Sequence, residues 1–244
     1  MPRKQKVVIF HGSFCTPEMM YLFARVLISL GWYDVIIPDL YRDRQEPYLY
    51  NYLQNAILAV EEERRSSDDP VIIIGYSMGG LIAQKVAEML GPKVVGKVVL
   101  MCSVPPRGIP LLNWNILRVL PKYAFDILGD RTFEPTWSDA EKFFFGFIPG
   151  EQRHKLYEEM RGEKGFAALQ MLTISMAVKA DAIECPILHV IARDDKFVPP
   201  SIGKKIADYY EGNVRVFPRH GHFLPFEPGR EVVAYAIHKW LGTE

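Results

Sequence analysis

The chain has 244 residues, of which 49% are apolar and 24% are charged, so it can bury one substantial core as a single large domain. Its 29 basic residues balance its 29 acidic residues, and this zero net charge gives no indication of a nucleic-acid partner. Cys15, Cys102 and Cys185 are widely spaced and form no CxxC pair, which argues against a disulfide framework and a structural zinc site. We therefore expect reduced cysteines in a cytoplasmic protein, and no membrane span, because no apolar run is long enough.

Apolar runs typical of buried strands alternate along the chain with amphipathic helical patterns. In chain order, the strand-like runs lie at residues 7–10, 34–37, 71–74, 94–102, 187–191 and 214–217. The helical patterns lie at residues 16–30, 48–65, 81–90, 201–210 and 230–241. Continuous apolar strands separated by helices predict an α/β fold, with a mostly parallel, twisted sheet covered by helices on both faces.

Residues 104–180 interrupt this alternation. They contain no clear strand and several helical patterns, which prolines are expected to separate. These prolines are Pro121, Pro135 and Pro149. The segment has 77 residues and is too long for an ordinary connection between two strands. We therefore predict a core of residues 1–103 and 181–244 with a helical lid, residues 104–180, inserted in it; the alternative is a helical layer that only covers the sheet.

The most informative stretch of the sequence is Gly75-Tyr76-Ser77-Met78-Gly79. Four β-branched residues precede it and a helical pattern follows it. A serine between two glycines at such a strand-to-helix turn is typical of a nucleophile elbow, because larger side chains would clash where strand and helix approach each other. The alternative is that Ser77 only caps the helix.

A serine nucleophile needs a base to accept its proton and a third group to orient that base. His220 and His222 follow the last predicted strand, at the carboxyl end of the sheet where α/β proteins bind ligands. Asp194 and Asp195 follow the preceding strand, and either of them could face the imidazole. The alternative role of this aspartate pair is turn chemistry at the surface.

Four motifs in this order resemble those of the α/β-hydrolase superfamily, in its single-domain esterase, lipase and C–C hydrolase branch. They span nearly the whole chain and read His11-Gly12-Ser13, Gly75-Tyr76-Ser77-Met78-Gly79-Gly80, Ala192-Arg193-Asp194-Asp195-Lys196-Phe197-Val198-Pro199 and Gly221-His222-Phe223. In the third motif Ala192 stands where the family usually has glycine, and this alignment favours Asp195 as the acid. The fourth motif favours His222 over His220 as the base.

The resemblance implies a catalytic triad that requires no metal and no organic cofactor. Its members are Ser77, Asp195 and His222. It also implies an oxyanion hole formed by the backbone N–H groups of Ser13 and Met78, with Phe14 as the second choice for the first donor.

These features predict a serine hydrolase that cleaves a carboxylic ester of a small, apolar molecule through an acyl-enzyme on Ser77. One alternative is C–C bond hydrolysis or acyl transfer by the same triad, and another is a ligand receptor that retains the triad. The residues expected to contact substrate are Phe14, Trp114, Trp137, Phe144 and Val198. Large apolar residues of this kind are more often part of a core than of a binding site.

Overall fold

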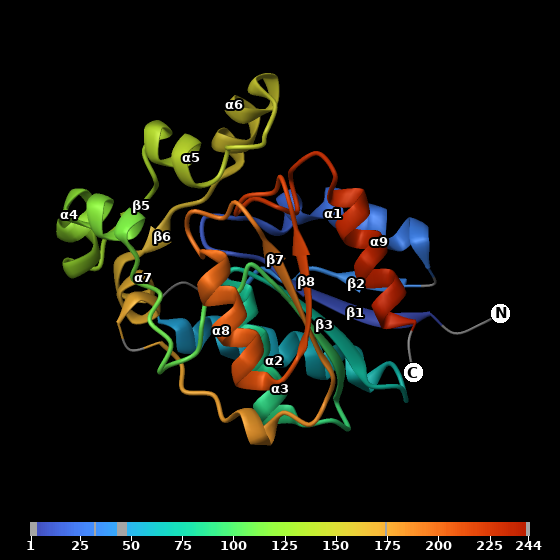
Figure 1. The fold of residues 1–244 in the computed structure, drawn as a ribbon. Coiled ribbons are helices and arrows are strands. Elements are labelled where there is room, and N and C mark those ends of the chain that lie inside the picture. Colours follow the sequence, from blue (N-terminus) through green and yellow to red (C-terminus); the bar gives the residue numbers. More distant parts are fainter. Residues whose placement is uncertain (1–3, 32, 43–47, 174, 243–244) are drawn as a thin grey trace.

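The computed structural model describes residues 4–31, 33–42, 48–173 and 175–242. At its centre is a six-stranded sheet in the order β2-β1-β3-β4-β7-β8, in which every neighbouring pair of strands is parallel (Figure 1). The strands are β1 (Gln5–Phe10), β2 (Tyr33–Ile36), β3 (Val71–Tyr76), β4 (Val95–Met101), β7 (Ile187–Ala192) and β8 (Asn213–Phe217). This sheet confirms the predicted α/β fold class.

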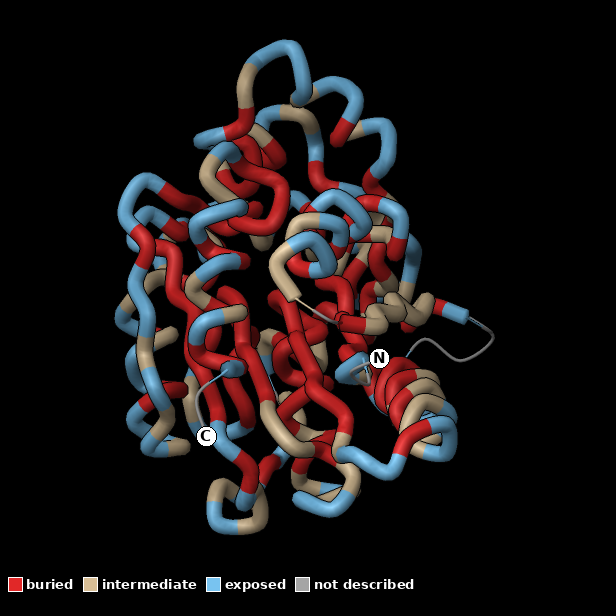
Figure 2. The backbone as a smooth tube through the Cα atoms, turned by 90° about the vertical axis from the view of Figure 1, so that its right-hand side faces the viewer, coloured by how far each residue is buried: buried red, intermediate tan, exposed pale blue. Residues whose placement is uncertain are grey.

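Helices cover both faces of the sheet. One face carries α1 (Pro17–Leu30) and α9 (Arg230–Leu241), and the other carries α2 (Leu49–Arg65), α3 (Met78–Leu90) and α8 (Pro200–Tyr210). In β1, Val7 and Ile9 pack with the first pair of helices, while Val8 and Phe10 pack with the others. The central strands therefore run through the buried interior of the molecule (Figure 2), and all six residues of β3 and of β7 are buried. Within the described ranges, no helix is both long and apolar enough to cross a membrane.

Residues 104–180, which we call the inserted segment, form a separate group of elements at one end of the sheet (Figure 1). They are α4 (Trp114–Leu128), β5 (Thr132–Phe133), α5 (Trp137–Phe143), α6 (Gly150–Glu159), β6 (Glu163–Lys164) and α7 (Gly165–Leu172). A 3₁₀ turn, Ala180–Ala182, then leads toward β7. The expectation of no strand here was wrong, because β5 and β6 pair as an antiparallel ladder. Strands of two residues are too short to leave an apolar alternation in the sequence.

The expectation that Pro121 separates two helices was also wrong, because this proline lies inside α4. A proline in a helix lacks the N–H that would bond to the carbonyl four residues earlier, here that of Leu117. Both residues are exposed, so water can satisfy this carbonyl and the helix continues. Pro135 and Pro149, in contrast, lie just before α5 and α6 and separate helices as predicted.

Candidate active site

Ser77 lies at the sharp turn between β3 and α3. Its φ is 53° and its ψ is −117°, a conformation that residues with a side chain rarely adopt. A Cβ atom on Gly75 would lie 2.4 Å from the Gly79 carbonyl oxygen, and one on Gly79 would lie 2.3 Å from that of Phe10. Only glycine fits at either position. The Ser77 side chain makes no capping hydrogen bond to α3, so helix capping does not account for it.

A hydrogen-bond relay connects Ser77 to a histidine and an aspartate. Ser77 Oγ lies 2.9 Å from His222 Nε2, and His222 Nδ1 lies 2.8 Å from Asp195 Oδ2. All three residues are buried. With the ring proton on Nδ1, the imidazole donates to the carboxylate and its Nε2 accepts from the serine hydroxyl. The fold thus brings together three residues that are far apart in the sequence.

The two neighbouring aspartates have different surroundings. The second oxygen of Asp195, Oδ1, accepts the backbone N–H groups of Phe197 and Val198, each at 2.8 Å. Asp194 instead accepts the N–H of Arg219 at 3.1 Å, in the turn that follows β8. Asp195 therefore faces the imidazole, and Asp194 has the turn chemistry that was its alternative role.

His220, the other candidate for the catalytic base, is bonded to a different carboxylate. His220 Nδ1 lies 3.0 Å from Glu227 Oε2, and this carboxylate also accepts the N–H of Gly221. Tyr76 donates its hydroxyl to the His222 carbonyl oxygen at 2.9 Å. Contacts on both sides thus fix the loop that carries His222. Neither Tyr76 nor Glu227 was identified from the sequence, because a single polar residue in an apolar or turn-rich stretch gives no pattern.

The loop after β1 lies against the nucleophile turn. A Cβ atom on Gly12 would lie only 3.0 Å from the Cβ of Ser77. The N–H of Phe14 donates to a tyrosine hydroxyl at 3.2 Å. The N–H groups of Ser13 and Met78, in contrast, donate to no acceptor in the described part of the chain. These two donors are therefore available to a ligand, and Phe14, the second choice for the oxyanion hole, is not.

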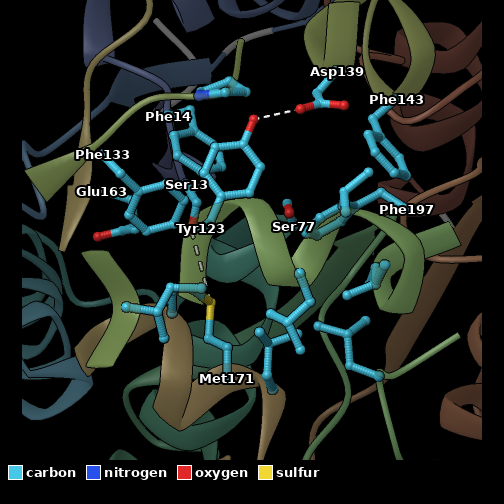
Figure 3. Close-up of a pocket in the computed structure, with 18 of the residues that line it drawn as sticks. Ser13, Phe14, Ser77, Tyr123, Phe133, Asp139, Phe143, Glu163, Met171 and Phe197 are labelled. Carbon is cyan, nitrogen blue, oxygen red and sulfur yellow. Dashed lines mark hydrogen bonds between the residues drawn. The ribbon is translucent and has the colours of Figure 1, made fainter. Parts of the chain in front are cut away.

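Beside Ser77 lies a cavity of about 90 Å³ (Figure 3). Sixteen of its 20 lining residues belong to the inserted segment, and 16 of the 20 are apolar or aromatic. The core contributes Ser13, Phe14, Ser77 and Phe197. The inserted segment contributes Val104, Leu111, Ile116, Val119, Leu120, Tyr123, Ile127, Phe133, Pro135, Asp139, Phe143, Phe144, Glu163, Ala168, Met171 and Leu172. The cavity is thus an apolar space that opens onto the serine and is closed mainly by the inserted segment.

The charged groups that line this cavity are both carboxylates, Asp139 and Glu163. The carboxylate of Asp139 accepts hydrogen bonds from Lys122 at 2.7 Å, Tyr123 at 2.5 Å and Thr136 at 2.8 Å. Although burial opposes ionisation, these hydrogen bonds lower the pKa of Asp139 below its ordinary value. No lysine, arginine or histidine is among the lining residues. The walls therefore offer no cationic side chain to an anionic substrate.

A family model described as "Alpha/beta hydrolase family" matches residues 7–235. The chain belongs to the alpha/beta hydrolase family. It is 22% identical to the uncharacterized hydrolase YugF of Bacillus subtilis, over 93% of this chain and 86% of YugF. It is 25% identical to the 2-hydroxy-6-oxononadienedioate/2-hydroxy-6-oxononatrienedioate hydrolase of Paraburkholderia xenovorans, over 96% of this chain and 87% of that protein. A solved structure of a lipase-esterase related protein from Clostridium acetobutylicum superimposes with a TM-score of 0.73 at 20% identity, over 98% of this chain and 95% of that one.

The cavity of this α/β-hydrolase includes only some of the residues expected to contact substrate. Phe14 and Phe144 line it. Trp114 does not, because it lies on the outer side of α4 with 76% of its surface exposed. Trp137 does not line it either, because its ring stacks on that of His154 with 4.4 Å between the ring centroids. Both tryptophans thus lie outside this cavity, since the sequence does not show which side of a helix faces it.

Val198 was the fifth expected contact, and it is not among the residues that line this cavity. It is buried, and its N–H donates to the Asp195 carboxylate. Most of the lining residues, among them Tyr123, Met171 and Phe197, were not predicted individually. Tyr123 and Met171 come from helices of the inserted segment, whose orientation over the sheet depends on contacts distant in sequence.

Cys102 lies close to the relay. Its Sγ, a carboxylate oxygen of Asp195 and a ring nitrogen of His222 all lie within 4.8 Å of one another. Burial raises the pKa of the Cys102 thiol well above its ordinary value. A thiol that stays protonated is a weak nucleophile and a weak metal ligand, so Cys102 has the character of a small core residue.

Proposed function

We propose that this α/β-hydrolase cleaves carboxylic esters of small, apolar molecules through an acyl-enzyme on Ser77. The observation that carries the proposal is the hydrogen-bond relay. Ser77 Oγ lies 2.9 Å from His222 Nε2, and His222 Nδ1 lies 2.8 Å from Asp195 Oδ2. A hydroxyl bonded to a buried imidazole, which is bonded in turn to a carboxylate, is the arrangement that activates a serine at neutral pH. Membership in a hydrolase family is consistent with this chemistry.

In the proposed reaction, Ser77 Oγ forms a bond to the ester carbonyl carbon while His222 Nε2 accepts the hydroxyl proton. The tetrahedral intermediate then collapses, the bond to the leaving alcohol breaks, and His222 returns the proton to that alcohol. A water molecule next gives its proton to His222 and attacks the acyl-enzyme, which releases the acid and regenerates Ser77. Asp195 keeps the imidazole oriented and stabilises it while it carries a positive charge.

The carbonyl oxygen becomes an oxyanion in both tetrahedral intermediates. We assign its stabilisation to the N–H groups of Ser13 and Met78, because neither donates elsewhere in the described residues. Met78 directly follows Ser77, and Gly12, the residue before Ser13, lies against the Ser77 side chain. Met78 is the first residue of α3, where the helix dipole also favours negative charge. Loss of one such donor typically costs about 3 kcal/mol of transition-state stabilisation.

We propose that the inserted segment acts as a lid and selects the substrate. It supplies 16 of the 20 residues that line the cavity, so a substrate bound at Ser77 would be enclosed mostly by this segment. The cavity of about 90 Å³ is smaller than the space of about 150 Å³ that is known to admit benzene in a protein core. The size and the apolar walls both favour a short acyl chain.

Ester cleavage is preferred over the C–C hydrolysis that was the main alternative. The name of the Paraburkholderia relative specifies dioate substrates, which carry two carboxylates. The cavity here has Asp139 and Glu163 on its walls and no cationic lining residue. An anionic group buried without a cationic partner is strongly disfavoured, so the walls suit a neutral substrate.

We also propose that the protein works in the cytoplasm. Cys15, Cys102 and Cys185 are all buried and unpaired. Burial raises the pKa of the Cys185 thiol to about 11, so this thiol stays protonated. Free cysteines are typical of reducing compartments.

The substitution Ser77→Ala tests the proposal. We expect the wild-type protein to hydrolyse 4-nitrophenyl acetate or butyrate and to be labelled on Ser77 by a fluorophosphonate probe, with the site mapped by mass spectrometry. Ser77→Ala should lose both activities, with turnover reduced by about 10⁴-fold or more because the nucleophile is absent. Its thermal unfolding should stay close to that of the wild type.

Undiminished turnover by a folded Ser77→Ala variant would refute the assignment of the nucleophile. The receptor alternative makes a different prediction. It requires tight binding of small apolar ligands together with negligible turnover of every ester tested. Ligand titration of the wild-type protein beside the ester panel distinguishes the two.

A further inference from the structure

We infer that Tyr41 and Glu163 are positioning residues for the oxyanion donor of Ser13, and that through them the inserted segment holds the turn that presents this N–H. The inference rests on the proposed serine hydrolysis, and it explains what holds one donor of the oxyanion hole in place. Tyr41 lies in the core after β2, and Glu163 lies in β6 of the inserted segment. The Tyr41 hydroxyl donates to Glu163 Oε2 at 2.8 Å.

The turn that carries Ser13 has an unusual residue in its third position. The N–H of Cys15 donates to the Gly12 carbonyl at 3.3 Å, which defines a β-turn with Phe14 as the third residue. Phe14 has a φ of 62°, in the left-handed region that such turns normally fill with glycine or asparagine. A bulky residue stays in this region only when surrounding contacts impose it.

The contacts that impose this conformation come largely from the inserted segment. The Phe14 carbonyl accepts the backbone N–H of Arg161 at 3.0 Å. The Phe14 ring meets that of Phe133 edge-on, with 5.6 Å between the ring centroids. Its N–H donates to the Tyr41 hydroxyl at 3.2 Å. Of these three partners only Tyr41 belongs to the core, and Tyr41 is itself bonded to Glu163.

The hydrogen bonds from Phe14 to Tyr41 and from Tyr41 to Glu163 each have a definite donor and acceptor. The Tyr41 oxygen accepts the N–H of Phe14, and its own proton goes to Glu163. Burial raises the pKa of Tyr41 well above its ordinary value, so the hydroxyl keeps this proton. The other carboxylate oxygen, Glu163 Oε1, accepts the Tyr52 hydroxyl at 2.8 Å and the Lys164 N–H at 2.9 Å. Glu163 is 1% exposed, so it accepts these hydrogen bonds inside the protein.

The turn fixes the direction of the Ser13 N–H. The Gly12 carbonyl and the Ser13 N–H belong to one planar peptide and point in opposite directions. The N–H of Cys15 and the Nδ1 of His11 both bond to this carbonyl and orient it, and the bond from Cys15 closes a turn in which Phe14 is left-handed. A small rotation of the turn re-aims the N–H relative to Ser77, and catalysis is sensitive to displacements of about 1 Å.

The two tyrosines that donate to Glu163 provide a matched experiment. Tyr41→Phe and Tyr52→Phe each remove one buried hydroxyl and one hydrogen bond to the same carboxylate, but only the first removes the contact with Phe14. We expect Tyr41→Phe to lower kcat for the preferred ester by about tenfold or more with KM within about twofold, since a misplaced oxyanion donor weakens only the transition state. The rate of Ser77 phosphonylation by the fluorophosphonate probe should fall in parallel. Tyr52→Phe should change both rates by less than about threefold at equal thermal stability.

The isosteric variant Glu163→Gln tests the acceptor. Two donors, Tyr52 and Lys164, converge on Oε1, so the glutamine oxygen is expected there and its NH₂ group toward Tyr41. The Tyr41 oxygen already accepts the Phe14 N–H, and its proton would lose the carboxylate oxygen of Glu163 as acceptor. We expect the same loss of kcat as in Tyr41→Phe, and no further loss in the double variant, because both changes break one chain of hydrogen bonds.

Equal losses in Tyr41→Phe and Tyr52→Phe, or a wild-type kcat in Tyr41→Phe, would overturn the inference. The labelling rate separates this outcome from failure of the proposed function. If Ser77 is labelled but no ester is hydrolysed, the ester assignment is wrong. The labelling rates of the two tyrosine variants still decide whether Tyr41 positions the donor.

Discussion

The two carboxylate oxygens of Asp195 bind different partners. The substitution Asp195→Asn therefore tests the role of the oxygen that faces His222. One oxygen accepts two backbone N–H groups, and the other faces His222. In Asp195→Asn the amide oxygen is expected to keep the N–H groups, which turns the NH₂ group toward Nδ1. The imidazole proton must then move to Nε2, where it prevents acceptance of the Ser77 proton. We expect kcat for the ester to fall by on the order of 10⁴ with little change in KM, measured by steady-state kinetics.

The neighbouring aspartate is the control for this prediction. Asp194→Asn changes the same functional group one residue away, but its carboxylate bonds to the Arg219 N–H and not to the imidazole. Its kcat should stay within about threefold of the wild type. A loss in Asp195→Asn no larger than that in Asp194→Asn would contradict the assigned role of Asp195.

At the scale of elements, the turn between β3 and α3 depends on backbone atoms that approach too closely for a side chain. A Cβ on Gly75 would lie 2.4 Å from the Gly79 oxygen and 2.6 Å from the Gly80 Cα. Backbone atoms cannot move aside as a flexible side chain can. We expect Gly75→Ala to lower the free energy of unfolding by about 2 kcal/mol or more, measured by urea denaturation, and to lower activity with it.

Gly150 offers a matched glycine in open space. It is the first residue of α6, and a Cβ there would have no neighbour within 4 Å. Gly150→Ala should be neutral or stabilising by up to about 1 kcal/mol, because alanine restricts the unfolded chain without a clash. Equal effects of the two alanines on the free energy of unfolding would show that close approach at the elbow is not the constraint.

At the scale of the whole molecule, a buried histidine in β7 predicts how stability changes with pH. His189 is 2% exposed, and its Nε2 has no hydrogen-bond partner in the described structure. Burial lowers the pKa of His189 from 6.5 to about 4. Between these two values the unfolded chain binds more protons than the native protein, so the free energy of unfolding falls as the pH decreases from 6.5 toward 4, by up to about 3 kcal/mol.

The variant His189→Leu isolates this contribution. It removes the titrating group, so its loss of stability between pH 7 and pH 4 should be smaller than that of the wild type by up to about 3 kcal/mol. Urea unfolding at a series of pH values measures the difference. Identical pH profiles for the two proteins would exclude His189 as a source of acid sensitivity. Any constant difference between them, which reflects packing alone, does not affect this comparison.

The sequence alone predicted the sheet, its main helices and the strand ends at which polar residues gather. These features are local: a run such as that of β3, with every residue buried, or a serine between glycines at a tight turn, depends on neighbours within a few positions. The resemblance to a family selected Asp195 and His222 from their neighbours, and the structure brings both residues to Ser77.

Only the tertiary structure decided which residues line the cavity and what surrounds the turn of Ser13. Trp114 and Phe144 are both large and apolar, but one faces solvent and the other faces the cavity, because helix orientation depends on packing with distant segments. Tyr41 and Glu163 are 122 residues apart and are joined by one hydrogen bond. Such a pair leaves no periodicity in the sequence. Its hydrogen bond stabilises the protein only once the fold has buried the two residues side by side.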